Sequence, residues 1–246
     1  MAVLAVERLA KSYDGVQALR DVSFIVDAGE LVALIGPNGA GKTTCFNIVN
    51  GQLRPDSGEV RLEGAPLTGL APRAIWRLGV GRTFQVAATF GSMTVRENVQ
   101  MVLLSRDRIL GSVLRKVDGL LAGEAGALLE RVGMSEQAER PCATLAYGDV
   151  KRVELAMALA HRPRLLLMDE PTAGMAPEER HALMSLAARL ARSERLAVLF
   201  TEHDMDSVFG FADRVMVLHD GGLIASGAPD EVRSDARVRE VYLGDA

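Results

Sequence analysis

The sequence predicts an α/β fold with a mostly parallel sheet, an antiparallel β subdomain and a helical insertion. Short apolar runs without polar alternation are typical of strands buried on both faces, and four are present: Leu31–Ile35, Leu165–Met168, Leu196–Phe200 and Val215–Leu218. Helical patterns over Lys42–Asn50 and Pro177–Ala191 separate most of these runs. Strands that alternate with helices favour a parallel sheet.

Other segments alternate between apolar and polar residues, as half-buried antiparallel strands do. These segments are Val3–Leu9, Val22–Val26 and Val60–Glu63. Turn signals set them off at Asp14-Gly15, Ala28-Gly29 and Asp56-Ser57-Gly58. We therefore expect residues 1–30 and 57–64 to contribute the antiparallel β subdomain.

The middle of the chain is mainly helical in pattern, so we expect residues of about 86–160 to form a helical subdomain. Within it, Ser105–Gly126 mixes charged residues and glycine with leucine and gives no clear pattern. No internal repeat or low-complexity linker interrupts the chain. We therefore expect one domain over residues 1–246.

Composition restricts the class of protein. The chain is 48% hydrophobic and 24% charged, with a formal net charge of −4, which argues against a broad nucleic-acid-binding face. Cys45 and Cys142 lack metal-ligand spacing and are expected to be free thiols in a reducing cytoplasm. No apolar run approaches the roughly 20 residues of a membrane helix, and Glu7 and Arg8 interrupt any signal peptide. We expect a cytosolic chain that reaches a membrane only through a partner.

A glycine-rich motif, G-x-x-x-x-G-K-[ST], lies between the first buried strand and the helix after it. Its glycines permit a backbone that turns consecutive N–H groups toward a triphosphate, and the helix start adds positive potential. Lys42 would add charge at the β and γ phosphates, and the Thr43 hydroxyl would ligate Mg²⁺. A chance glycine-rich turn is the alternative, but the strand and helix context favours binding and hydrolysis of ATP with magnesium. The predicted binding residues are Gly36, Pro37, Asn38, Gly39, Ala40, Gly41, Lys42, Thr43 and Thr44.

Two acids end the apolar run Leu165–Met168. Ligands of parallel α/β sheets bind beyond the carboxyl ends of the strands. Asp169 is therefore expected to hold Mg²⁺ through water, and Glu170 to act as the general base that orients the attacking water. A solvated strand end is the alternative interpretation.

Together with these motifs, the whole chain resembles the ATP-binding subunits of ABC transporters. Tyr13, with Val16 beside it, resembles the aromatic residue that stacks on adenine. Gln85, in Arg82-Thr83-Phe84-Gln85, resembles the Q-loop glutamine that reaches Mg²⁺ and senses the membrane partner. His203 resembles the switch histidine at the γ-phosphate. Taken singly, these three residues could instead be a half-buried strand-end aromatic, a surface amide and a helix cap.

The resemblance implies a P-loop NTPase (RecA-like) core that closes with a second subunit around two nucleotides. Leu145-Ala146-Tyr147-Gly148-Asp149 stands where the signature motif belongs. Ala146, Tyr147 and Gly148 would therefore contact the partner's ATP in trans.

Within that family, four segments resemble the LivG-type subunit of branched-chain amino-acid importers: Arg82–Gln85, Met93–Val99, Leu145–Gly148 and Val241–Gly244. This resemblance implies a LivF-like ATPase or a second copy of this chain as partner, two membrane permease subunits and a periplasmic binding protein. It places the chain at the cytoplasmic face of the inner membrane. Import of urea, amides or aromatic acids, a non-transport ABC ATPase and a non-catalytic nucleotide switch are the alternatives.

The sequence departs from the family pattern at three positions. Ala146 replaces the signature serine, Asp149 replaces its glutamine, and Ala176 replaces the usual Asp or Asn of the D-loop. Asp149 is expected to act as a helix N-cap, with Lys151 and Arg152 offsetting its charge. These departures affect the residues with which the chain would contact a partner's ATP. We therefore hypothesise that, in a heterodimer, the site on this chain's phosphate loop hydrolyses ATP faster than the site on the partner's loop.

Overall fold

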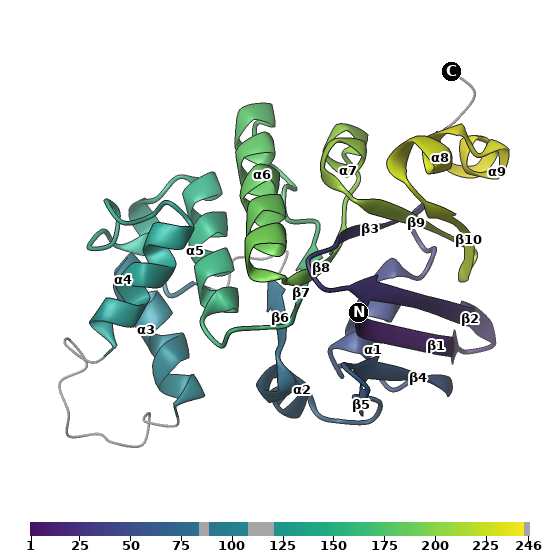
Figure 1. The fold of residues 1–246 in the computed structure, drawn as a ribbon, viewed down its shortest axis with the longest axis horizontal. Helices are drawn as coiled ribbons and strands as arrows, with labels where there is room; N and C mark the ends of the chain where they lie inside the picture. The colour runs from purple at the N-terminus through teal and green to yellow at the C-terminus, as the bar shows by residue number, and fades with distance from the viewer. Residues whose placement is uncertain (84–88, 108–120, 244–246) are drawn as a thin grey trace.

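The computed structural model describes residues 1–83, 89–107 and 121–243. Its central sheet has the strand order β10-β9-β3-β8-β7-β6 (Figure 1). The strands from β9 to β6 are parallel, and β10 is an antiparallel edge strand. The bounds are β3 (Leu31–Ile35), β6 (Val80–Thr83), β7 (Leu165–Asp169), β8 (Ala197–Thr201), β9 (Arg214–His219) and β10 (Gly222–Gly227). The predicted parallel core is confirmed.

Both faces of this sheet are covered, which explains the apolar runs without alternation. In β3, Leu31, Ala33 and Ile35 join one hydrophobic cluster, whereas Val32 and Leu34 join the other. The first cluster includes residues of α6 (Pro177–Glu194), α7 (Met205–Phe211), α8 (Pro229–Ser234) and α9 (Ala236–Val238). The second lies between the sheet and α1 (Lys42–Val49). A π-helical turn, Arg239–Leu243, follows α9.

A separate antiparallel sheet packs onto the second cluster, with the strand order β2-β1-β4-β5. Its strands are β1 (Ala2–Tyr13), β2 (Val16–Asp27), β4 (Ser57–Leu62) and β5 (Ala65–Pro66). The first two strands are longer than predicted, because their exposed ends pair with each other up to the turn at Asp14-Gly15. Both turn residues have positive φ, 48° and 86°, which suits a two-residue hairpin loop.

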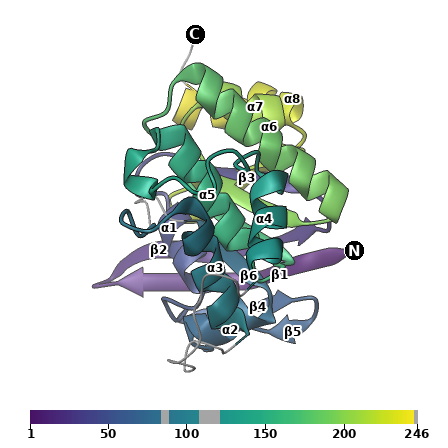
Figure 2. The same ribbon diagram turned by 90° about the vertical axis from the view of Figure 1, so that its left-hand side faces the viewer.

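Helices α3 (Val95–Arg106), α4 (Ala122–Arg131) and α5 (Tyr147–Leu159) pack on one another beside the central sheet (Figure 2). A capping box begins α3: the Thr94 hydroxyl accepts a hydrogen bond from the Glu97 amide at 3.1 Å, and the Glu97 carboxylate accepts from the Thr94 amide at 2.6 Å. Residues 108–120, within the segment without a clear pattern, lie outside the described residues. The short helix α2 (Pro72–Leu78) and strands β6 and β10 were not predicted.

A candidate nucleotide site at the carboxyl ends of the central strands

The phosphate loop connects β3 to α1 and is packed closely against neighbouring backbone. Gly36 has φ +147°, and a Cβ there would lie 2.0 Å from the Leu218 carbonyl oxygen. The Lys42 side chain is nearly buried, and its Nζ donates to the carbonyl oxygens of Gly36 at 2.6 Å and Pro37 at 3.0 Å. The amides of Thr43 and Thr44 belong to the first turn of α1, where N–H groups have no partner within the helix. The loop is therefore shaped to receive an anion.

Gly41 allows a quantitative test of this packing. It has φ +104°, and an added Cβ would lie 2.3 Å from the Ala18 carbonyl oxygen. We expect Gly41→Ala to lower the free energy of unfolding by about 1–3 kcal/mol more than Gly39→Ala, because overpacking adds that amount to the backbone strain. Gly39 is the matched control, since it also has positive φ, +84°, but open space around its Cβ position. Urea unfolding of both variants measures the difference, and equal losses would contradict the packing argument.

The two acids are held at the end of β7 by the adjacent strand. Asp169 accepts hydrogen bonds on both oxygens: Oδ1 from the Thr201 hydroxyl and Oδ2 from the Arg82 guanidinium, each at 2.9 Å. The Glu170 amide donates to both the carbonyl oxygen and the hydroxyl of Thr201, at 3.1 Å. Glu170 has φ +46°, a strained conformation for a non-glycine residue that is concentrated at functional sites. The chain thus turns sharply so that both carboxylates project at this edge.

His203 meets the second of these acids. Its Nε2 lies 3.1 Å from Glu170 Oε1, so the predicted general base and the predicted switch histidine are in direct contact. The buried Glu202 orients this loop: it accepts from the His203 amide at 3.1 Å, and from the Thr172 amide at 2.8 Å and hydroxyl at 2.6 Å. Sequence reasoning missed Glu202, although a carboxylate at the end of a buried strand is the signal that could have revealed it.

Lys42 shares the electrostatic environment of the two acids. Burial lowers the pKa of Lys42 from its usual 10.5, and the charges of Glu170 and Asp169 partly oppose this effect. The structure therefore brings the phosphate loop, Asp169, Glu170 and His203 to one place. Cys45, on α1, is not reactive in this setting, because burial raises its pKa to about 12.

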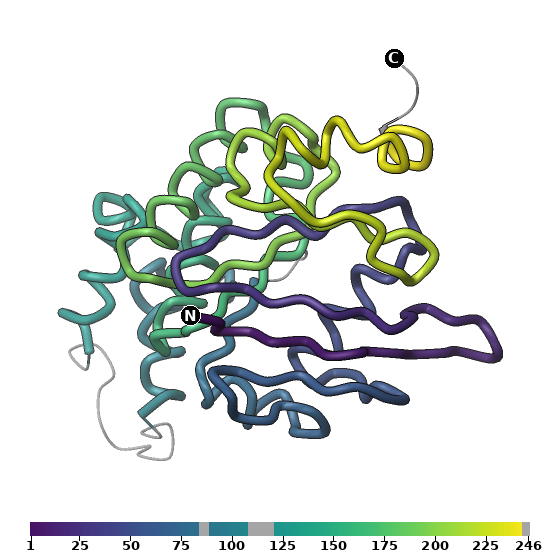
Figure 3. Tube along the Cα trace, turned by 45° about the vertical axis from the view of Figure 1, so that its right-hand side comes forward, coloured from purple at the N-terminus to yellow at the C-terminus, as the bar shows by residue number. Residues whose placement is uncertain are grey.

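The β1–β2 hairpin lies beside the phosphate loop. The Ala18 carbonyl borders Gly41, and the Arg20 amide donates to the Gly221 carbonyl at 2.7 Å, which fastens the hairpin to the β9–β10 turn (Figure 3). Tyr13 and Val16 flank the hairpin turn and are 42% and 70% exposed. The Lys11 ammonium lies over the Tyr13 ring, 5.6 Å from its centroid.

The chain is similar to known ABC transporter proteins over nearly its whole length. The family model for ABC transporters matches residues 19–173, and a model of the branched-chain amino acid ATP-binding cassette transporter matches residues 223–246. The high-affinity branched-chain amino acid transport ATP-binding protein LivG of Salmonella typhimurium is 39% identical, over 99% of this chain and 98% of that protein. The chain belongs to the family of ABC transporter ATP-binding proteins.

Two further relatives extend the likeness. BraF of Pseudomonas aeruginosa, a high-affinity branched-chain amino acid transport ATP-binding protein, is 38% identical over 99% of this ABC protein and 98% of its own length. The ADP conformation of MJ1267, an ATP-binding cassette of an ABC transporter, is 30% identical, with a TM-score of 0.88 and full coverage of both chains. The predicted ABC ATPase fold is confirmed.

In this ABC protein the segment predicted to be the signature motif, Leu145–Asp149, lies at the start of α5. Ala146 is the N-cap of that helix, and Tyr147 is 43% exposed. The prediction that Asp149 is the N-cap is wrong, since the helix starts earlier and Asp149 lies in its first turn. Gly148 faces α6, because a Cβ there would lie 2.8 Å from Glu179 Oε1. Lys151 is buried and pairs with Glu154 at 2.9 Å.

The residues of the site fit a magnesium nucleotide. Thr43 and Asp169 offer hydroxyl and carboxylate oxygens, which Mg²⁺ prefers. Among the described residues, no group of three or more His, Cys, Asp or Glu could hold a metal alone. The third predicted ligand, Gln85, lies outside the described residues.

Among the helices that the structure describes, none has the length and apolar character needed to cross a membrane.

Proposed function

We propose that this ABC ATPase hydrolyses ATP with magnesium to power the import of branched-chain amino acids. The observation that carries the substrate class is the match of residues 223–246 to the branched-chain family model, together with the full-length likeness to LivG and BraF. The observation that carries the chemistry is the contact between His203 and Glu170 next to the phosphate loop.

The chain's own residues account for the hydrolytic step. The phosphate loop and Lys42 bind the triphosphate, Tyr13 stacks on adenine, and Glu170 accepts the proton of the attacking water. His203 holds the Glu170 carboxylate through Nε2 and would contact the γ-phosphate when nucleotide is bound. Thr43, Asp169 and Gln85 would hold magnesium, which would supply positive charge to neutralise the phosphate oxygens.

A second ATP-binding subunit completes the site, either a LivF-like partner or another copy of this chain. The exposed Tyr147, with Ala146 and Gly148, would contact the partner's ATP through the positive start of α5. The altered residues, Ala146, Asp149 and Ala176, contribute only to the composite site on the partner's phosphate loop. The composite site on this chain's phosphate loop is therefore the faster of the two.

The heterodimeric transporter can test this asymmetry. We expect Glu170→Gln in this chain to lower transporter turnover more than the equivalent change in the partner subunit, because the partner's site receives the altered signature segment. Phosphate release by the two reconstituted single variants gives the comparison. The asymmetry is refuted if Glu170→Gln leaves turnover unchanged while the partner's change abolishes it.

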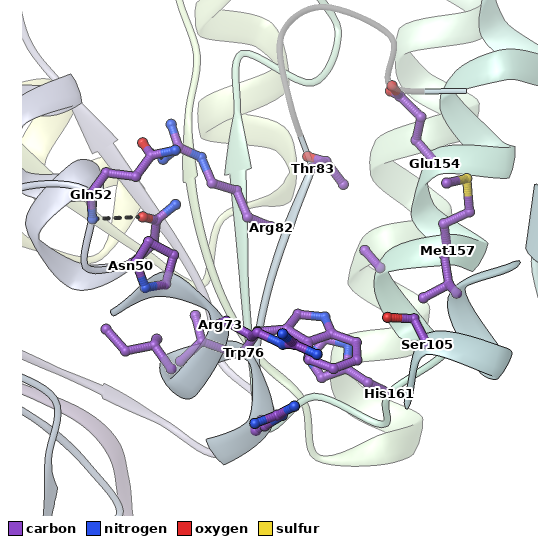
Figure 4. Close-up of a pocket in the computed structure, with 16 residues that line it drawn as sticks. Asn50, Gln52, Arg73, Trp76, Arg82, Thr83, Ser105, Glu154, Met157 and His161 are labelled. Carbon is purple, nitrogen blue, oxygen red and sulfur yellow. Dashed lines mark hydrogen bonds between the residues drawn. The ribbon is translucent and has the colours of Figure 1, made fainter. Parts of the chain in front are cut away.

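A groove of about 490 Å³ between α2, β6, α3 and α5 offers a place for a membrane permease subunit (Figure 4). Trp76 stacks on His161 at one end, with ring centroids 4.7 Å apart, while Gln52 and Arg82 lie together at the other. Arg73 and Arg77 add positive charge. We assign to it a cytoplasmic helix of the permease that carries apolar and acidic side chains, which would hold this ATPase at the cytoplasmic face of the inner membrane.

Reconstitution tests the proposed transport role. The chain would be assembled with its partner ATPase and two permease subunits in liposomes, and the periplasmic binding protein would be added with leucine, urea or a short amide. We expect ATP hydrolysis to rise with leucine alone. Stimulation by urea or an amide but not by leucine would reassign the substrate, and stimulation by none of them would contradict the transport role.

A further inference from the structure

Arg82 joins three separate parts of the nucleotide site. It lies near the end of β6, which pairs with β7. Its Nη2 donates to Asp169 Oδ2 at 2.9 Å, and its Nη1 donates to Asn47 Oδ1 at 2.9 Å and Gln52 Oε1 at 3.1 Å. One guanidinium therefore links the metal-binding carboxylate at the end of β7 to α1, the helix that follows the phosphate loop, and to the turn after it.

The link is shielded from solvent, so it is more than a surface ion pair. The side chains of Arg82 and Asp169 are 11% and 15% exposed. Asp169 is held from two sides, because its other oxygen accepts a hydrogen bond from the buried Thr201 hydroxyl at 2.9 Å. A carboxylate has about four acceptor positions, so each oxygen can still accept a hydrogen bond from water bound to a metal.

We propose that Arg82 is a positioning residue that orients Asp169 toward magnesium and so sets the affinity of the site for magnesium nucleotide. The proposal rests on the assignment of Asp169 to magnesium under the proposed function. Partners that orient a metal ligand typically change metal affinity about 10- to 100-fold when they are replaced.

The positive charge of Arg82 and its orientation of Asp169 have opposite effects on magnesium affinity. The direction of the change in a variant therefore shows which of the two effects dominates. A guanidinium beside Asp169 repels Mg²⁺, so removal of this charge alone would tighten magnesium binding. Loss of orientation would weaken it. Lysine keeps the charge but lacks the planar fork that serves Asp169, Asn47 and Gln52 together. A geometric role therefore predicts that Arg82→Gln and Arg82→Lys both weaken magnesium binding.

The experiment measures the affinity for ADP by calorimetry, with saturating MgCl₂ and with EDTA. The ratio of these two affinities reports the magnesium contribution without any turnover. We expect the ratio to fall about tenfold in Arg82→Gln and in Arg82→Lys, while the affinity in EDTA stays within about twofold of the original. Arg189→Gln is the control, because it removes an exposed arginine from α6 and should leave the ratio unchanged.

A double-mutant cycle with Asp169→Asn shows whether Arg82 acts through that carboxylate. We expect Asp169→Asn alone to lower the ratio, and Arg82→Gln to lower it no further in the Asp169→Asn background. A raised or unchanged ratio in Arg82→Gln, or full additivity in the cycle, would overturn the positioning role. If Asp169→Asn itself leaves the ratio unchanged, the magnesium assignment fails instead. Thermal melting of each apo variant checks that the chain remains folded.

Discussion

Glu170→Gln is expected to lower kcat for ATP hydrolysis by roughly 10²- to 10⁴-fold, the usual contribution of a general base. Glutamine has the same shape as glutamate and can keep the contact with His203, which lies 3.1 Å from Glu170 Oε1. It cannot accept the proton of the attacking water. ATP binding should therefore persist while phosphate release slows by this factor. Equilibrium binding of ATP measures the first, and single-turnover phosphate release measures the second.

Glu178→Gln provides the matched control for this experiment. Glu178 is an exposed acid in the first turn of α6, so its replacement removes the same charge without touching the site. Hydrolysis by this variant should match that of the original protein. Normal phosphate release by Glu170→Gln would remove Glu170 from the role of general base.

Lys42→Met is expected to weaken ATP binding by roughly 10- to 100-fold, because hydrogen bonds to charged groups contribute about 1.5–3 kcal/mol. The ammonium is nearly buried within the loop and is already held by the Gly36 and Pro37 carbonyls. It is therefore fixed in place before the triphosphate arrives, and little side-chain entropy remains to be lost. Equilibrium titration with ATP in magnesium buffer measures the effect.

The Lys42 variant also loses the two bonds to the loop carbonyls, so the state of the apo protein must be measured separately. Thermal melting without nucleotide shows whether the loop variant remains folded. Arg189→Met, an exposed position on α6, is the control for loss of a positive charge. Unchanged ATP affinity in Lys42→Met would mean that the backbone amides alone bind the phosphates.

The sequence predicted the parts of the fold that are encoded locally. The central strands were found because both faces are buried, which leaves continuous apolar runs. β6 and β10 were missed because the segments Val80–Thr83 and Gly222–Gly227 contain glycine and polar residues and pair at the edges of the sheet. The hairpin strands extend past their apolar centres because main-chain pairing, not burial, maintains their exposed ends.

The candidate site also has a part that the local sequence predicts and a part that depends on contacts between distant segments. The phosphate loop and the acids at the end of β7 follow local patterns, so they were predicted from the sequence. The roles of Arg82 and Thr201 were not, because each meets Asp169 only through strand pairing between distant segments. Asp149 was assigned as a cap from its residue type, whereas the position at which α5 starts depends on its packing.

The strand order also bears on how the protein is made. β3, which carries the phosphate loop, has β8 and β9 as its two neighbours in the sheet, and these strands begin at Ala197 and Arg214. A nascent chain therefore exposes the nucleotide-binding motif long before the strands that support it leave the ribosome. Chains are synthesised at about 5–20 residues per second, so the interval between synthesis of β3 and synthesis of its two neighbouring strands is on the order of ten seconds. Nucleotide binding is thus a property that this protein acquires only after β8 and β9 have been synthesised.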